Sequence, residues 1–338
     1  MREAERQTRS TLIQKFETGG FHPRTDLGQN FLIDLNLLGY IVHEADLGLD
    51  DVVLEIGAGT GGMTAFLAER AGAVVSVEID HRIFPLAQEA VSGFNNVTLL
   101  NCDALANKNH FHPQVLEALH RELAKYPDRR VKLVANLPYC IATPVVSNLV
   151  ASDLPWESMI ITIQWELADR MRSQPKTGEY SALSVWLQSQ SHVKLMKKLG
   201  PTVFWPRPGV DSAVVRIVAE HNRRGEIIDR EFFHGFIRRL FTQRRKHLRS
   251  VLVGMYRKQL DRAKIDAALL PFNFKDGVRA EELDVETLVK LSNAMRQLFP
   301  DAPPSAATQP VAEPADDQID GQISEATDAD RPADSDAS

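Results

Sequence analysis

Residues 52–62 read VVLEIGAGTGG. The run of β-branched and apolar residues predicts a buried strand. The glycines that follow it allow the backbone to approach a ligand closely before a helix begins. A strand, a glycine-rich loop and a helix in this order are typical of a parallel α/β sheet, whose ligands bind at the carboxyl ends of the strands. The stretch therefore predicts a site for a nucleoside-containing cofactor in a doubly wound, Rossmann-like fold.

The same alternation continues on both sides of this stretch, to about residue 165. Strands are predicted at 52–56, 73–79, 97–101, 131–135 and 159–164. Helices are predicted at 62–70, 81–92, 113–125 and 144–151. This order predicts a parallel sheet with helices on both faces. Two further apolar runs, at 192–196 and 213–219, predict an antiparallel hairpin at the edge of the sheet.

The pattern changes after the sheet. From about residue 229 only helices are predicted, most clearly at 230–241, 244–259 and 285–298. Beyond residue 300 there are few large apolar side chains, so this segment cannot bury enough surface to fold. The predicted organisation is an N-terminal leader over 1–26, a Rossmann-like sheet domain over 27–221, a helical domain over 222–300 and a disordered acidic tail over 301–338.

Composition narrows the class of protein. The 338 residues are 43% hydrophobic and 25% charged, which is typical of a soluble globular protein. No apolar run approaches the roughly 18–20 residues that span a bilayer, and the polar N-terminus has no apolar core of a secretory signal. Two cysteines, Cys102 and Cys140, are too few for a disulfide framework. We therefore expect a cytoplasmic protein that does not contact a membrane.

The net charge of −6 conceals an uneven distribution. Residues 301–338 contain ten acidic side chains and one arginine, so they carry −9 and the other 300 residues carry +3. Within that remainder, residues 194–260 contain sixteen Lys or Arg and five Asp or Glu, a net charge of +11. Such a concentration is compatible with a polyanionic partner. A solvated basic helix is the commoner explanation of the same pattern.

Carboxylates lie at or near the carboxyl ends of the first three predicted strands. Glu55 lies two residues before Gly57, where it can anchor the amino-acid end of a cofactor. Glu78 comes 21 residues after Gly57, where a carboxylate commonly accepts hydrogen bonds from ribose. Asp103 can accept a bond from an adenine amino group, although taken alone it could also be a turn or helix N-cap residue. The glycine spacing also fits a dinucleotide fingerprint, so S-adenosylmethionine and NAD are both candidate cofactors.

The most specific stretch is Asn136-Leu137-Pro138-Tyr139, after the fourth predicted strand. The Asn136 oxygen and the carbonyl of Leu137 or Pro138 can accept both N–H bonds of an amine on a flat ring, on which Tyr139 can stack. An adenine amine is a poor nucleophile because its lone pair is delocalised into the ring. Two acceptors favour a pyramidal nitrogen and return that lone pair for attack. This arrangement needs no hydride and favours S-adenosylmethionine, although a plain proline turn is the simpler structural alternative.

Six segments together resemble the KsgA family of bacterial small-subunit rRNA adenine dimethyltransferases. They are LGQNFLID at 27–34, EIGAGTG at 55–61, VEID at 77–80, NLPY at 136–139, VDSAVVR at 210–216 and FTQRRK at 241–246. The resemblance implies a class I S-adenosylmethionine methyltransferase sheet with a small all-helical C-terminal domain that binds RNA. It also implies dimethylation of N6 of two adjacent adenosines near the 3′ end of 16S rRNA. The expected partner is an assembly intermediate of the small ribosomal subunit, and we expect the chain to act as a monomer.

The resemblance also implies roles for individual residues. Cofactor contacts are expected from Gln29, Asn30, Leu32, Glu55, Gly57, Gly59, Glu78, Asp103, Ala104 and Asn136. Contacts to the target adenine are expected from Asn136, Leu137, Pro138, Tyr139 and Phe204, the last of which would by itself be interpreted as a core aromatic. By their spacing alone, Arg244, Arg245, Lys246 and Arg249 can present their charge on one face of a helix, where we expect phosphate contacts with RNA. A solvated helix face is the plainer alternative. No metal is expected, because the histidines and cysteines lack the spacing of a zinc site.

Three positions depart from the family pattern. Cys140 stands where Asn or Asp is usual, and Trp165 and Gly209 stand where lysine is common. A covalent role for Cys140 is disfavoured, since no base lies near it in the sequence. Three alternative functions are a large-subunit rRNA adenosine methyltransferase that confers antibiotic resistance, a ribosome-assembly or transcription factor that binds RNA without catalysis, and an NAD-dependent dehydrogenase.

Overall fold

The computed structural model describes residues 9–20, 22–24 and 27–299. The predicted tail at 301–338 and the first eight residues of the predicted leader therefore lie outside the described residues. Within the described part of the chain, no helix combines the length and the apolar character needed to cross a bilayer. A helix that was not predicted, α1 (Arg9–Gly19), lies in the leader.

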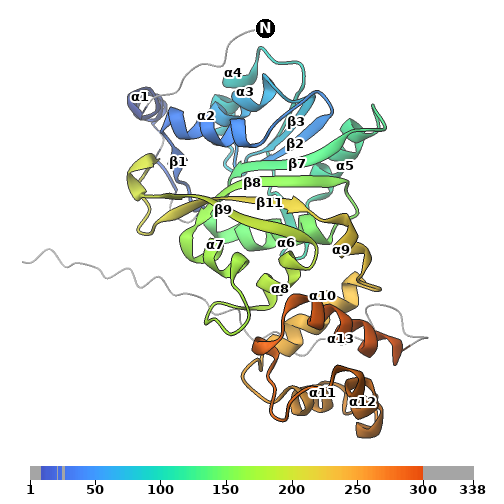
Figure 1. Ribbon diagram of the computed structural model, residues 1–338. Helices are drawn as coiled ribbons and strands as arrows, with labels where there is room; N and C mark the ends of the chain where they lie inside the picture. The colour runs from blue at the N-terminus through green and yellow to red at the C-terminus, as the bar shows by residue number, and fades with distance from the viewer. Residues whose placement is uncertain (1–8, 21, 25–26, 300–338) are drawn as a thin grey trace, which may run out of the picture.

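The centre of the structure is a seven-stranded sheet (Figure 1). The strand order is β4 (Val97–Leu100), β3 (Ala73–Val77), β2 (Asp51–Ile56), β7 (Arg130–Asn136), β8 (Trp156–Gln164), β11 (Ser212–Ala219) and β9 (Ser191–Leu199). The first five strands pair in parallel, and β11 is antiparallel to both of its neighbours. The predicted strands and the predicted edge hairpin are thus confirmed. One antiparallel strand inside the edge distinguishes this sheet from the all-parallel order typical of dinucleotide-binding domains.

Helices cover both faces of the sheet because side chains alternate along each strand. One face packs against α2 (Leu35–Glu44) and α3 (Gly62–Ala68), through a buried cluster that includes Ile41, Leu67 and Val53. The other face receives α5 (Pro113–Leu123), α6 (Ala142–Ala151), α7 (Trp165–Arg172) and α8 (Ala182–Gln188). A further helix, α4 (Phe84–Val91), packs beside α3. The expected two-sided packing is confirmed.

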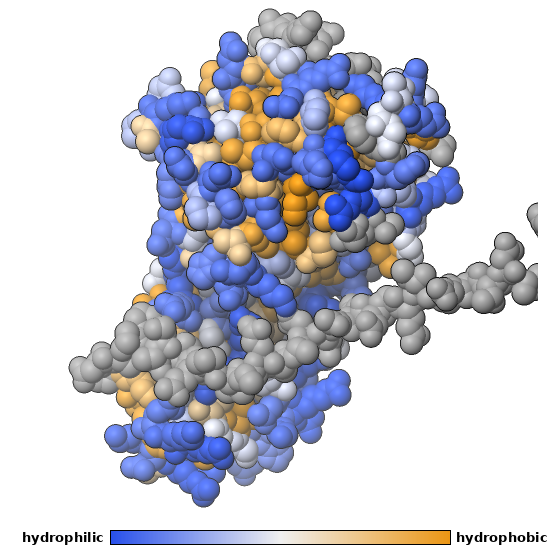
Figure 2. Space-filling model, turned by 180° about the vertical axis from the view of Figure 1, so that it is seen from behind, coloured by the Kyte–Doolittle hydropathy of each residue, from blue (hydrophilic) through white to orange (hydrophobic). Residues whose placement is uncertain are grey.

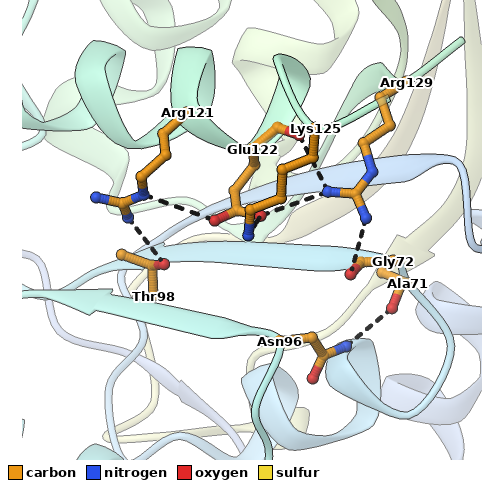
Figure 3. A network of polar contacts seen from close by, with 8 residues as sticks. All are labelled: Ala71, Gly72, Asn96, Thr98, Arg121, Glu122, Lys125 and Arg129. Carbon is orange, nitrogen blue, oxygen red and sulfur yellow. Dashed lines mark hydrogen bonds and ion pairs between the residues drawn. The ribbon is translucent and has the colours of Figure 1, made fainter. Parts of the chain in front are cut away.

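The amino ends of the strands are held by a polar network on the side away from the ligand edge (Figure 3). Arg129 donates to the carbonyls of Glu122 and Gly72 at 3.0 and 3.4 Å, which ties α5 to the turn before β3. Asn96 donates to the carbonyls of Ala68 and Ala71, both at 2.9 Å. A Cβ at Gly72 would lie 1.8 Å from the Leu49 carbonyl oxygen, so only glycine fits this turn. This end of the sheet is therefore structural.

Helices form the C-terminal part: α9 (His221–Gly225), α10 (Arg230–Phe241), α11 (Leu248–Tyr256), α12 (Arg262–Leu269) and α13 (Val285–Gln297). Helix α10 begins where Asp229 accepts the Phe232 N–H at 2.9 Å, and it buries apolar residues at helical spacing. The predicted helix at 244–259 is wrong at its start. Residues 242–246 form turns, and α11 begins only at Leu248, whose N–H is bonded to the Val278 carbonyl at 2.8 Å.

The helical part lies below the sheet in Figure 1, and its apolar side chains belong to the same core cluster as those of the sheet. Trp186 of α8 stacks on His234 of α10 at 4.3 Å between ring centroids, and one apolar cluster runs through both parts. Seen from behind, the visible surface of the helical part is mostly hydrophilic, while hydrophobic residues gather on the sheet-bearing part (Figure 2). The domain boundary near residue 221 stays a prediction, since the apolar core is continuous across it.

Candidate cofactor and target-base site

An open cavity lies at the carboxyl ends of β2, β3, β4 and β7. Its lining contains most of the residues predicted for the site: Gln29, Asn30, Gly57, Gly59, Glu78, Asp103, Ala104, Asn136, Leu137, Pro138 and Tyr139. An adjoining cavity shares Gly57, Gly59 and Asn136 and is lined also by Leu32 and Glu55. The fold therefore brings together predicted residues from five separate segments of the sequence.

The glycine-rich loop after β2 forms one wall. Gly57 and Gly59 have φ values of 86° and 57°, in the left-handed region that favours glycine. A Cβ at Gly57 would lie 3.3 Å from the Pro138 ring, and one at Gly59 would lie 3.1 Å from the Phe31 ring. Because Gly57 and Gly59 have no side chains, the backbone at these two positions can approach both a ligand and the neighbouring segments closely.

The Asn136 amide is held in one orientation at the end of β7. Its Nδ2 donates to the Asn30 carbonyl at 2.7 Å, which directs the donor side of the amide toward the leader and leaves Oδ1 as an acceptor. The Pro138 carbonyl accepts the Ile141 N–H at 3.1 Å and retains a second lone pair. The Tyr139 hydroxyl lies 2.6 Å from Ser212 Oγ, which fixes the tilt of the ring. Burial raises the pKa of Tyr139, so this hydroxyl stays protonated.

The N-terminal segment closes the site by contacts that join distant parts of the chain. Strand β1 (Phe31–Leu32) pairs with β10 (Phe204–Trp205), and Gln29 donates to Asp80 Oδ2 at 3.0 Å. Phe16 of α1 packs edge-on against Phe31 and Trp205, each at 5.2 Å. Helix α1 was not predicted, although two buried apolar residues four positions apart, Leu12 and Phe16, indicate one face of a helix.

Two buried carboxylates stand behind the glycine loop. Glu78 accepts the N–H groups of Gly59 at 2.7 Å and Asp80 at 2.9 Å, and burial raises the pKa of Glu78 to about 7 despite these bonds. Glu55 is 1% exposed and accepts the hydroxyls of Thr64 and Ser76, both at 2.6 Å. Burial likewise raises the pKa of Glu55 to about 7. Both groups thus change protonation near neutral pH, which makes this end of the cavity sensitive to the charge of its ligand.

The chain is similar in sequence to known proteins. A family model described as ribosomal RNA adenine dimethylase matches residues 20–295. The chain belongs to this family. A relative from Streptococcus pneumoniae (strain P1031), named ribosomal RNA small subunit methyltransferase A, is 37% identical over 281 residues, which cover 83% of this chain and 94% of the relative. A protein of the same name from Lactiplantibacillus plantarum is also 37% identical, over 83% of this chain and 92% of that protein.

Solved structures show the same fold. A dimethyladenosine transferase from Plasmodium falciparum is similar with a TM-score of 0.65 and 22% identity, over 78% of this chain and 97% of the other. The 23S rRNA methyltransferase ErmE is similar with a TM-score of 0.54 and 24% identity, over 79% and 100% respectively. The predicted fold class and the predicted family of methyltransferases are therefore confirmed, and the NAD-dependent alternative is rejected.

Some predicted site residues of this dimethylase-family chain lie elsewhere or have other contacts. Phe204 is 1% exposed, belongs to the apolar cluster beneath α2 and lines neither cavity, so its stacking role stays a prediction with the ring in a core position. Asp103 is exposed, and its Oδ1 accepts the Leu105 N–H at 2.9 Å, which leaves Oδ2 for a ligand. Cys140 and Cys102 also line the cavity, and burial raises the pKa of both thiols, which disfavours a nucleophilic role.

The four cations that were predicted to share one helix face have different surroundings in the structure. Since residues 242–246 form turns, the four cations do not follow one helix, and the prediction of a shared face by helical spacing is wrong. Arg244 contacts backbone carbonyls of the loop before α8, and Arg249 forms a two-pronged ion pair with Asp266 at 2.6 and 2.8 Å. Arg245 and Lys246 are exposed, and neither side chain has a hydrogen bond or ion pair within the part of the chain that the structure describes. In the same described part, no group of three or more His, Cys, Asp or Glu is placed to hold a metal ion.

Proposed function

We propose that this chain uses S-adenosylmethionine to methylate N6 of two adjacent adenosines near the 3′ end of 16S rRNA, twice each. The proposed substrate is an assembly intermediate of the small ribosomal subunit, on which the chain acts as a cytoplasmic monomer. The family supplies the class of reaction. The choice of subunit is supported by relatives at 37% identity that are named ribosomal RNA small subunit methyltransferase A.

The observation that carries the proposal is the orientation of the Asn136 amide. Since Nδ2 is bound to the Asn30 carbonyl, Oδ1 is the group that remains for an amine in the cavity. The free lone pair of the Pro138 carbonyl is a second acceptor from the same turn. Two fixed acceptors suit an amine that donates two hydrogen bonds, which is the chemistry of adenine N6. Their preorganisation means that little has to move when the amine arrives.

The lining of the cavity fits S-adenosylmethionine, which supplies an electrophilic methyl group when bound. The side-chain-free backbone at Gly57 and Gly59 allows close approach of a ligand, and a Cβ at either position would crowd Pro138 or Phe31. Glu78 would hold the ribose, Asp103 the adenine and Glu55 the amino-acid end. Burial favours the neutral form of Glu55 and Glu78, so a cationic amino group or a hydroxyl donor nearby would stabilise the ionised form.

The chain's own groups act by holding the target. Tyr139, fixed through Ser212, offers a ring face to a base that has left its stack, as base-modifying enzymes generally require. Asn136 and Pro138 then orient the amine toward the methyl donor. No general base is assigned, because N6 loses its proton readily once it has been methylated. Arg245 and Lys246 would hold phosphates and position the RNA without reading its sequence.

The alternatives make different predictions. A binding-only assembly factor would not need the acceptor geometry of Asn136 or the glycine backbone of the cavity. A large-subunit substrate is the other alternative, because ErmE has the same fold. The test is methyl incorporation from labelled S-adenosylmethionine into unmethylated small and large subunits, followed by nuclease digestion and mass spectrometry of the nucleosides. Dimethyladenosine near the 3′ end of 16S rRNA is the expected result. Incorporation only into large subunits, or none with intact cofactor binding, would refute the proposal.

A further inference from the structure

Arg244 makes contacts that are unlike those of a phosphate-binding arginine. Its Nη1 donates to the Tyr180 carbonyl and its Nη2 to the Gly178 carbonyl, the latter at 2.8 Å. Its Nε lies 3.6 Å from Glu281 Oε2, and only 24% of the side chain is exposed. All three nitrogens of the guanidinium group are therefore engaged within the protein, in a planar fork that a lysine cannot reproduce.

The loop at 173–181, between α7 and α8, is held by the helical part at several further points. The Lys176 N–H donates to the Glu281 carbonyl at 2.8 Å. The Tyr180 hydroxyl donates to the Leu283 carbonyl at 3.0 Å, and its ring packs edge-on against Phe241 at 5.6 Å. Tyr180 is fully buried. Arg244 thus completes a joint in which one loop of the sheet-bearing part is bound by two separate segments of the helical part, 241–244 and 281–283.

Helix α7 connects this joint to Tyr139 of the cavity. Helix α7 begins at Trp165, directly after β8, and its first N–H donates to the Asp211 carbonyl at 2.9 Å. The residue after Asp211, Ser212, holds the Tyr139 hydroxyl. The other end of α7 is fixed to α8, because Ser184 donates to the Arg170 carbonyl at 2.6 Å. A change at the joint would therefore shift α7, whose amino end contacts the segment that holds the Tyr139 hydroxyl.

We propose that Arg244 is a positioning residue that fixes the helical part relative to the catalytic cavity, and that phosphate contact in this segment comes from Arg245 and Lys246. The inference rests on the proposed function, since it assigns how the two surfaces are held in register on RNA. Holding the two parts rigidly presents the phosphate-binding cations and the acceptors of the base site at one fixed separation. Loss of that register misplaces the base, and a displacement of about 1 Å can cost roughly 100-fold in rate.

The test compares Arg244→Lys and Arg244→Gln with Lys246→Arg and Lys246→Gln in the full chain, on unmethylated small subunits. Both Arg244 variants are expected to lower kcat by at least about tenfold, because the lysine keeps the charge but not the fork. Cofactor affinity and the salt dependence of subunit binding should not change. Lys246→Gln should instead raise KM and reduce the salt slope by roughly one, as loss of one phosphate contact does. Lys246→Arg keeps the positive charge, so the salt slope of this variant should match that of the wild type.

A second readout does not depend on RNA. Amide hydrogen exchange in segments 174–181 and 241–247 should become faster in Arg244→Lys, which keeps the apolar stem of the side chain and is the variant to use should Arg244→Gln fail to fold. Unchanged exchange, or wild-type kcat in both Arg244 variants, would overturn the inference. A reduced salt slope in Arg244→Gln that Arg244→Lys restores would show direct phosphate contact instead. An inactive wild-type chain would refute the proposed function, while the exchange result would still decide the role of Arg244.

Discussion

Replacing Glu55 by glutamine should change how stability depends on pH. Burial raises the pKa of Glu55 from 4.5 to about 7, although Thr64 and Ser76 both donate to it. A carboxyl group whose folded-state pKa lies above its unfolded value stabilises the fold fully below about pH 4.5. That contribution is lost as the pH rises toward 7, because ionisation is then easier in the unfolded chain. The glutamine side chain of the Glu55→Gln variant does not titrate and has no such transition.

The size of the effect follows from the two pKa values. A pKa difference of about 2.5 corresponds to roughly 3.4 kcal/mol, at about 1.4 kcal/mol per pKa unit. About 2.5 kcal/mol of this is lost between pH 5 and pH 8 by linkage. Wild type should therefore lose about 2.5 kcal/mol more unfolding free energy than Glu55→Gln over this interval. The cost of burying the extra amide hydrogens is the same at both pH values, so it cancels from this difference.

The assay is urea-induced unfolding of the cofactor-free chain at pH 5 and pH 8. Exposed Glu117 of α5 provides the matched control, since Glu117→Gln removes a carboxylate that is not buried. Its effect on unfolding free energy should be similar at both pH values. If the difference between wild type and Glu55→Gln is also the same at both values, Glu55 is ionised throughout. The two hydroxyl donors would then outweigh burial, and the reasoning from burial would be refuted.

Other substitutions test the acceptor, the backbone and the tail. Asn136→Ala should abolish methylation while cofactor affinity, measured by calorimetry, stays within about tenfold, or about 1.4 kcal/mol; near-wild-type rates would remove the amine-orienting role. Gly59→Ala should weaken cofactor binding, because a side chain at φ 57° costs about 1–2 kcal/mol and meets the Phe31 ring at 3.1 Å. The control Gly254→Ala, in α11 with open space around it, should raise the unfolding free energy by up to about 1 kcal/mol and leave cofactor binding unchanged. Deletion of 301–338 should leave melting temperature and activity nearly intact, and a large loss of either would contradict a passive tail.

Local patterns in the sequence were sufficient to predict the strands of the sheet. The run at 52–62 and its later counterparts predicted the strands because a buried parallel strand must be apolar along its whole length. Strand ends were also predictable, and with them the edge at which Glu78, Asp103 and Asn136 meet. The prediction of a helix at 244–246 was wrong. The composition of this stretch suits a helix. The turn there ends with the bond from the Leu248 N–H to the Val278 carbonyl, whose partner lies 30 residues away in the sequence.

The sequence by itself determined the order of the elements, the family and the identity of the groups that converge at the carboxyl edge. Only the tertiary structure decided what those groups contact. It placed the Asn30 carbonyl on the Asn136 amide, enclosed Glu55 and put Phe204 in the core. It also separated Arg244, bound in a joint between the two parts, from the exposed Arg245 and Lys246. The physical reason is that burial, hydrogen-bond partners and pKa depend on segments distant along the chain, whereas propensity and periodicity depend on neighbours in the sequence.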